Sequence, residues 1–98
     1  MKLLALPEGF QWDGGNFDKS LFDHEVLNQE AEGVFFDRKK FIFKDKLHSE
    51  GEERYRILGK TNRNRLLFVV FTLRDNRVRI ISARDMNKKE VYLYEKRT

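Results

Sequence analysis

The chain of 98 residues contains no cysteine. It can therefore form neither a disulfide nor a thiolate metal site, and a mechanism with a cysteine nucleophile is excluded. Long apolar segments are also missing, because no stretch approaches the roughly 18 apolar residues that a membrane-spanning helix needs. The short apolar run near the N-terminus is interrupted by Pro7 and Glu8, too early for a signal peptide. We therefore expect a cytoplasmic protein without a membrane partner.

The sequence also lacks motifs that bind metal ions or phosphate-bearing cofactors. No group of histidine, aspartate and glutamate residues has the spacing of a metal site. Gly14 and Gly15 form a plain turn, and the sequence contains no glycine-rich phosphate loop. We therefore predict no metal site and no cofactor. With 40% apolar residues, the chain is expected to fold as one domain over residues 1–98.

What the chain does contain is an uneven distribution of charge. Residues 1–50 carry 7 lysine and arginine residues against 10 aspartate and glutamate residues, whereas residues 51–98 carry 13 against 6. Such a basic half is either a set of solvated faces or a docking surface for an anionic partner, for which nucleic acid is the first candidate. Arginine outnumbers lysine in this half, which favours recognition of an anion over mere solubility.

The first half of the sequence predicts a short strand followed by two helices. Residues 9–12 alternate like a strand, and Asn16 is a suitable N-cap for a helix that runs to about His24. Asn28 is a suitable N-cap for a second helix over residues 29–36, in which the apolar residues follow helical spacing.

From Lys40 the apolar pattern changes to a period of two, which predicts strands. Asp75 and Asn76 fit a tight hairpin because both residue types tolerate positive φ, and Asn87 can cap a final helix over residues 88–96. The expected fold class is α+β, with two N-terminal helices on one face of an antiparallel meander of about four strands and a short C-terminal helix. The predicted strands cover residues 40–44, 52–58, 66–73 and 77–83.

The segment from His48 to Arg84 contains eight arginines, more than a hairpin core requires. A surface that holds phosphates would use them, because guanidinium keeps its charge and matches phosphate oxygens in pairs. For Arg54, Arg79 and Arg84 the alternative is that one or two of them form surface ion pairs with Glu52, Glu53 or Asp85. The eight are Arg54, Arg56, Arg63, Arg65, Arg74, Arg77, Arg79 and Arg84.

Several motifs spread over residues 9–95 resemble those of one protein family, the BrnT toxins, which are RelE-like ribonucleases of type II toxin–antitoxin pairs. The combination of the block that begins at His48 with the block that ends at Arg84 is specific, whereas either block alone is weak. The motifs are F-x-W-D from Phe10, the helix ending V-F-F at Phe36, H-S-E-G-E-E-R-Y from His48, R-L-L-F-V-V-F-T from Arg65 and R-I-I-S-A-R from Arg79.

The resemblance implies a RelE-like fold and a cytoplasmic toxin that cleaves RNA without metal and inhibits translation. It also implies a BrnA-like ribbon-helix-helix antitoxin that neutralises the toxin, with DNA bound only indirectly through that antitoxin. The chain departs from the family pattern in the first helix, where family members have two lysines and a glycine. Phe22, Asp23 and Glu25 stand at those positions here, which removes positive charge from that helix.

RNA cleavage without metal uses the 2′-hydroxyl as nucleophile, so it needs a base, an acid and cations that stabilise the charged phosphorane. Arg54, Arg79 and Arg84 are the expected phosphate and transition-state ligands, because they belong to the two specific blocks. His48, which titrates near neutral pH, and Glu53, which a flanking arginine would keep ionised, are competing candidates for acid and base. A structural role is the alternative for each.

Further residues are expected to bind RNA rather than to react with it. The cations Arg56, Arg65 and Arg77 are candidates for phosphate contacts. Trp12 and Tyr94 either stack on bases or anchor their segments to the core.

Three functions remain compatible with the sequence. The first is a metal-independent endoribonuclease toxin, and the second is a toxin-fold module that binds antitoxin or RNA without cleaving it. The third is a nucleic-acid-binding domain outside any toxin–antitoxin pair. The altered first helix motivates the second alternative.

Overall fold

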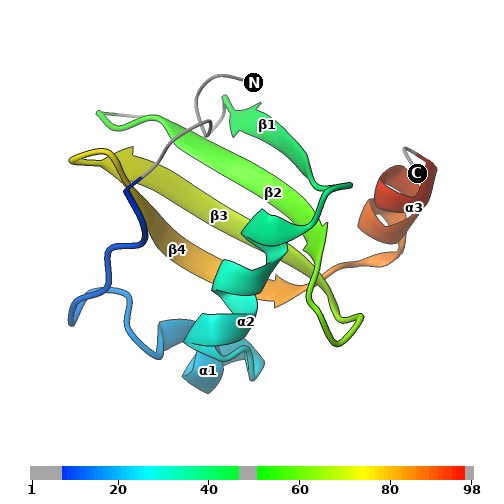
Figure 1. The fold of residues 1–98 in the computed structure, drawn as a ribbon, viewed down its shortest axis with the longest axis horizontal. Helices are drawn as coiled ribbons and strands as arrows, with labels where there is room; N and C mark the ends of the chain where they lie inside the picture. Colours follow the sequence, from blue (N-terminus) through cyan, green and yellow to red (C-terminus); the bar gives the residue numbers. More distant parts are fainter. Residues whose placement is uncertain (1–7, 47–50, 97–98) are drawn as a thin grey trace.

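The fold consists of one four-stranded antiparallel sheet with helices before and after it (Figure 1). The computed structural model describes residues 8–46 and 51–96. The strands follow one another in the order β1-β2-β3-β4, which is a simple meander. This confirms the predicted α+β fold. The strands are β1 (Phe41–Asp45), β2 (Arg54–Lys60), β3 (Leu66–Arg74) and β4 (Arg77–Asp85).

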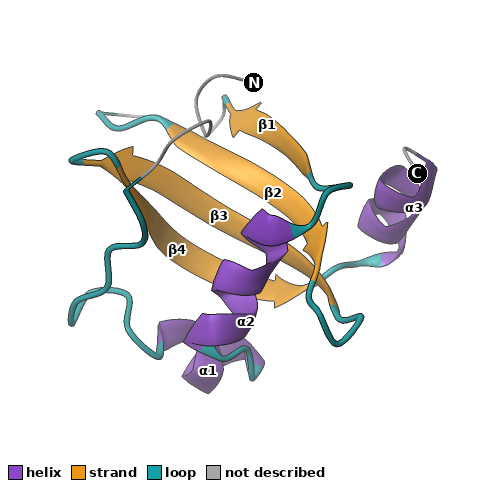
Figure 2. Ribbon diagram, in the orientation of Figure 1, coloured by secondary structure: helices purple, strands orange, loops and turns teal. Residues whose placement is uncertain are grey.

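Two short helices precede the sheet and one follows it (Figure 2). They are α1 (Lys19–His24), α2 (Asn28–Gly33), which continues as the 3-10 turn η2 (Val34–Phe36), and α3 (Lys88–Lys96). Helix α2 and η2 cover one face of the sheet, which we call the helix face. Helix α1 lies beside β4, where the Ala83 N–H donates to Ser20 Oγ at 2.8 Å. Within the described ranges, no helix is long and apolar enough to cross a membrane.

Strand β3 is buried on both of its faces, as its nearly continuous apolar sequence predicts. Leu67, Val69 and Phe71 point to the helix face, where they join the main core with residues of α2 and η2. On the opposite face Phe68 forms a smaller cluster with Leu58 and Tyr94. We call this opposite side of the sheet the open face.

The prediction that Asn16 caps the first helix is wrong. Helix α1 starts at Lys19 after Asp18, whose φ is 60° and whose side chain makes no cap hydrogen bond. Asn16 is buried instead, and its amide group donates to the carbonyl oxygens of Gln11 at 3.0 Å and Ile80 at 2.9 Å. It therefore ties the N-terminal loop to β4, because a buried amide needs hydrogen-bond partners wherever it finds them.

Helix α2 also starts one residue earlier than predicted, at Asn28. The Leu27 N–H donates to Glu30 Oε1 at 3.0 Å, while the Asn28 side chain pairs with Asp18 across the interhelical turn. The α-helical part ends at Gly33, and the last three predicted residues form the 3-10 turn. Glycine is a poor helix former, so the tightening of the helix at Gly33 has a local cause.

The strand expected over residues 9–12 is only a single parallel bridge between Phe10 and Val78, outside the named strands. Strand β2 begins two residues later than predicted and extends to Lys60, and β4 continues past Ala83 to Asp85. The tight hairpin is confirmed, since Asp75 and Asn76 have φ values of 51° and 61°.

Gly59 on β2 and Gly33 at the end of α2 give a matched test of how η2 packs against the sheet. A Cβ added to Gly59 on β2 would lie 2.7 Å from Val34 Cβ and 3.0 Å from the Val34 carbonyl oxygen, so η2 sits where only glycine leaves room. We expect Gly59→Ala to lower the free energy of unfolding by about 1–3 kcal/mol through overpacking. Gly33→Ala is the control, because an added Cβ meets nothing within 4 Å there. Urea unfolding of both variants measures the difference, and equal stability would contradict the account.

Candidate functional site

Six of the arginines singled out in the sequence point to the open face of the sheet. Because side chains alternate along a strand and residues directly opposite one another share a face, the register fixes their directions. Arg54 lies opposite Asp45, and Arg56 lies between Phe43 on β1 and Val70 on β3. Arg79 lies opposite Thr72 and Arg84 lies opposite Phe68. The open face therefore carries these four arginines over its width, and Arg74 and Arg77, which lie opposite one another next to the hairpin, share it.

An irregularity in β4 brings Arg79 and Arg84 to the same face. Val70 pairs with Ser82 but Phe71 pairs with Ile80, so Ile81 is an extra residue in β4. Such a bulge shifts the alternation by one residue. Ile80 before the bulge and Ala83 after it both belong to the main core. In a regular strand, Arg79 and Arg84 would point to opposite faces.

Phe68 is the platform on which two of these arginines rest. The Arg84 guanidinium carbon lies 4.0 Å from the centroid of the Phe68 ring, and that of Arg56 lies 5.6 Å from it. Arg56 also lies 6.0 Å from the Phe43 ring centroid. Phe68 is only 7% exposed, so the ring offers each cation a partly desolvated partner, where such contacts are strongest.

Each of these two arginines also has a carboxylate partner. Arg84 donates from Nη1 and Nη2 to the two carboxylate oxygens of Glu90, at 2.8 and 3.0 Å. Arg56 Nε lies 3.2 Å from Asp45 Oδ2. Glu90 also closes a reciprocal cap with Asn87 at the start of α3, with both bonds at 2.9 Å. The Glu90 carboxylate therefore fixes the Arg84 guanidinium and connects it to α3, whereas Asp45 holds Arg56 by charge from the neighbouring strand β1.

Burial opposes the charge of Glu90, but the surrounding groups outweigh it. The hydrogen bonds from Arg84 and from the Asn87 N–H, together with the charges of Arg84 and Arg56, hold the pKa of Glu90 below its usual value of 4.5. Glu90 is therefore ionised at neutral pH, and its charge offsets that of Arg84.

A second group of arginines and carboxylates lies at the end of the sheet that carries the β3–β4 hairpin. Arg79 forms a two-pronged ion pair with Asp13, at 2.9 and 3.0 Å, and also donates to Gln11 Oε1. Only 12% of the Arg79 side chain is exposed. Arg74 forms a similar pair with Glu52, at 2.6 and 3.2 Å. Arg79 therefore fastens the N-terminal loop to the sheet.

Glu52 shows how closely the charges of this second group interact. The hydrogen bond from Arg74 is the main reason that the pKa of Glu52 is lowered, and the charges of Arg54 and Arg79 lower it further against the cost of desolvation. Three arginines therefore act on one carboxylate. The sequence raised ion pairing as the alternative for Arg54, Arg79 and Arg84. Arg79 and Arg84 do pair with carboxylates, but with Asp13 and Glu90 rather than with Glu52, Glu53 or Asp85.

Of the two candidates for acid and base, His48 and Glu53, the structure describes only Glu53. His48 lies outside the described residues. Glu53 accepts hydrogen bonds from Lys44 Nζ at 2.9 Å and from the Tyr55 hydroxyl at 2.8 Å. These two donors hold the pKa of Glu53 below its usual value, so it is ionised. Lys44 and Tyr55 lie opposite one another in the register, on the helix face.

The remaining candidates for RNA contacts are divided between the two faces, because Arg77, opposite Arg74, and Tyr94, beside Phe68, belong to the open face. Arg65 pairs with Asp85 and Glu30, and Arg77 is exposed beside the β3–β4 hairpin. Trp12 donates from Nε1 to Glu32 at 2.6 Å and packs against the main core.

Tyr94 is 3% exposed, and its hydroxyl donates to Asp37 Oδ2 at 2.6 Å. Burial and this bond raise its pKa. Trp12 and Tyr94 both have the anchoring contacts that the sequence left as the alternative to base stacking.

Sequence reasoning missed four residues of the open face and its rim, namely Asp13, Asp45, Phe68 and Glu90. Glu90 carried a signal, because it stands three residues after Asn87 in the spacing of a capping box. Phe68 was included only in a general apolar strand, although its distance from the arginines depends on register. Asp13 stands in the F-x-W-D motif, but neither that motif nor the sequence around Asp45 predicts the contacts with arginines, because these contacts are tertiary.

The comparison with protein families decides what kind of protein carries this site. The model of the ribonuclease toxin BrnT, of type II toxin–antitoxin systems, matches residues 12–90. The chain belongs to the BrnT family. A comparison with the curated proteins finds no significant match. Family membership implies an RNA target and an antitoxin partner for this chain, and the matched range contains all four strands and the open-face arginines.

The structure shows why a glycine would suit position 25, where this chain has glutamate. Glu25 stands where the family pattern has glycine, and it occupies the left-handed region at φ 57° immediately after α1. Glycine is the residue that adopts this conformation without strain. Phe22, which replaces a lysine, is 85% exposed on α1. Its ring therefore contributes little to the core.

Glu90→Gln tests the link between α3 and the open face. The variant keeps the shape of the side chain but loses the charge, and we expect a loss of about 1–2 kcal/mol in the free energy of unfolding at pH 7. Because the pKa of Glu90 is lowered in the folded state, its contribution is present above pH 4.5 and is lost as the pH falls through the lowered value.

The difference between wild type and Glu90→Gln should therefore narrow from pH 7 to pH 3 in urea-unfolding measurements. Asp23→Asn, at an exposed position on α1, serves as the control and should change stability little at either pH. A difference that widens in acid would contradict the assigned pairing.

Proposed function

We propose that this BrnT-family protein is an endoribonuclease that binds single-stranded RNA on the open face and cleaves it without a metal ion. The observation that supports this proposal is the pair Arg56 and Arg84, held side by side on Phe68. Two preorganised guanidiniums at one point of a sheet suit the two non-bridging oxygens of an RNA phosphodiester. Cleavage of RNA in the cytoplasm would inhibit translation.

The chemistry follows from what RNA itself supplies. The 2′-hydroxyl attacks the adjacent phosphorus, and the 5′-oxygen leaves. Negative charge grows on the phosphate oxygens in between, and positioned cations that act on this charge usually provide the largest contribution to the rate. Arg84 uses Nη1 and Nη2 for Glu90, but a guanidinium has five N–H donors. Donors on Nε and Nη2 are thus left for a phosphate.

Proton transfer is assigned to His48 and Glu53 in this proposal, with the order left to experiment. Glu53 has the ionised state that a base requires. Its bonds to Lys44 and Tyr55 would have to loosen for it to reach a 2′-hydroxyl on the open face. Arg54 and Arg79 complete the basic surface around the pair.

A ribbon-helix-helix antitoxin of the BrnA type is the proposed neutralising partner. In the toxin–antitoxin complex this antitoxin would bind DNA, so the toxin itself needs no DNA-binding surface.

Cleavage of a short RNA in EDTA tests the proposed site. We expect Arg84→Ala to lower the cleavage rate by about 10²–10³-fold, the usual loss when one transition-state donor is removed. Arg84→Lys keeps the charge without the planar fork and should recover only part of the rate. Arg63→Ala, at an exposed residue of the β2–β3 turn, is the control and should cleave like wild type. If Arg84→Ala cleaves as fast as wild type, the site is wrongly assigned.

A second candidate function is a toxin-fold module that binds antitoxin or RNA without cleaving it. The ion pairs support it, because Arg79 is held by Asp13 and Arg84 by Glu90. The uncharged Phe22 and the acidic Asp23 on α1 support it as well, since the family pattern has lysines there.

Restoring the family residues distinguishes the two functions. The triple change Phe22→Lys, Asp23→Lys and Glu25→Gly should create growth arrest and RNA cleavage if the chain has become inactive. If wild type already cleaves RNA in EDTA, the non-catalytic function is excluded. Wild type and the triple variant are compared for growth after expression without antitoxin, and circular dichroism checks that both fold.

A further inference from the structure

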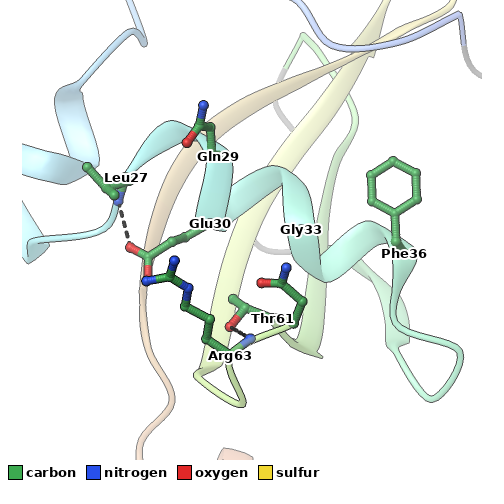
Figure 3. Close-up of a pocket in the computed structure, with 8 residues that line it drawn as sticks. Leu27, Gln29, Glu30, Gly33, Phe36, Thr61 and Arg63 are labelled. Atoms are coloured by element: carbon green, nitrogen blue, oxygen red, sulfur yellow. Dashed lines mark hydrogen bonds between the residues drawn. The ribbon is translucent and has the colours of Figure 1, made fainter.

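A groove outside the open face lies between α2 with η2 and the turn that joins β2 to β3 (Figure 3). It encloses about 460 Å³. Leu27, Gly33 and Phe36 line its helical wall, and Thr61 and Arg63 lie on the turn opposite. A second hollow shares Gly33, Phe36 and Thr61 and continues towards Tyr94. None of the open-face arginines lines either hollow.

The helical wall of this groove leaves apolar groups in water. Phe36 is 78% exposed and Leu27 about half exposed, although full burial of such a side chain is worth about 1.5–3 kcal/mol. Between them, Gly33 keeps the wall open. A Cβ added to Gly33 meets nothing within 4 Å, so the packing of this chain does not require glycine there. An incoming apolar side chain could occupy that space.

The rim of the groove has the opposite character, because its exposed charges are basic. Glu30 and Asp37 are the acidic residues at the groove, and both are engaged internally. Glu30 accepts from the Leu27 N–H and from Arg65, and Asp37 accepts from the Tyr94 hydroxyl and from the Lys39 and Lys60 N–H groups. The exposed cations around the groove are Arg38, Lys39, Lys60 and Arg63.

We propose that this groove is the docking site for an acidic segment of the antitoxin that places an apolar side chain beside Gly33 and Phe36. An apolar floor with a basic rim complements an amphipathic segment with acidic flanks, because apolar burial supplies affinity and charge supplies orientation and encounter rate. The inference rests on the antitoxin partner of the proposed function. It separates the anchor of the antitoxin from the surface that binds RNA phosphates.

Filling the groove from within tests the proposal. Gly33→Leu puts a side chain into the space reserved for the partner, whereas Gly14→Leu adds the same side chain at an exposed loop position where a Cβ also meets nothing within 4 Å. The probe is a purified ribbon-helix-helix antitoxin of the BrnA type, titrated by calorimetry. We expect Gly33→Leu to weaken binding at least about tenfold, as when a central contact is lost, and Gly14→Leu to bind like wild type.

Two further measurements make the test independent of folding and of catalysis. Gly33→Leu should not lower the melting temperature, because leucine forms helices better than glycine, and its RNA cleavage without antitoxin should equal that of wild type. Because the chain has no cysteine, Asn62→Cys at the groove and Gly14→Cys outside it each introduce one thiol for maleimide labelling. Bound antitoxin should slow maleimide labelling of the Asn62→Cys variant and leave labelling of the Gly14→Cys variant unchanged.

The possible outcomes separate the proposal from its competitors. Unchanged antitoxin affinity in Gly33→Leu, or labelling at position 62 in the complex, overturns it. Loss of self-association or of RNA binding in Gly33→Leu, with the antitoxin still bound, would assign the groove to a second copy or to RNA and also overturns it. Groove-dependent binding by a protein that cleaves no RNA would leave this inference standing while the proposed ribonuclease function fails.

Discussion

The register of β3 against its two neighbours is the constraint on which the site depends. Leu67, Val69 and Phe71 are buried on the helix face and Phe68 on the open face, so a slip by one residue would exchange the two sets. The same register places Arg56 and Arg84 beside Phe68. The apolar burial that stabilises the sheet thus also positions the cations. Stability and the candidate site cannot be altered independently at this strand.

Carboxylates partly neutralise the basic surface that we propose for RNA. A sheet with several arginines on one face would repel itself, and the ion pairs with Asp13, Glu52 and Glu90 relieve that repulsion. They also oppose RNA, because a phosphate must share or replace them. The structure therefore has an arginine surface that is ordered before RNA arrives and partly neutralised, which favours specific geometry over high affinity.

The sequence was sufficient for the fold, because long apolar strands, an Asp-Asn hairpin and a capped last helix each have a local signature. Helix starts were predicted less well, since Asn16 and Asn28 use their side chains for tertiary contacts rather than as caps. The site was predicted in part. Arg54, Arg56, Arg79 and Arg84 do share a face, but for Arg79 and Arg84 this depends on the bulge at Ile81, which the regular alternation of apolar residues did not reveal.

The central claim is that RNA phosphates contact Arg56 and Arg84 on the open face. The most direct test is the salt dependence of binding of a short RNA with a 2′-deoxy group at each reactive position, which cannot be cleaved. Each lost phosphate contact should reduce the slope of log affinity against log salt concentration by about 0.7. The account predicts this reduction for Arg56→Ala and for Arg84→Ala and none for Phe36→Ser in the groove. Slopes in both arginine variants equal to that of wild type would contradict it.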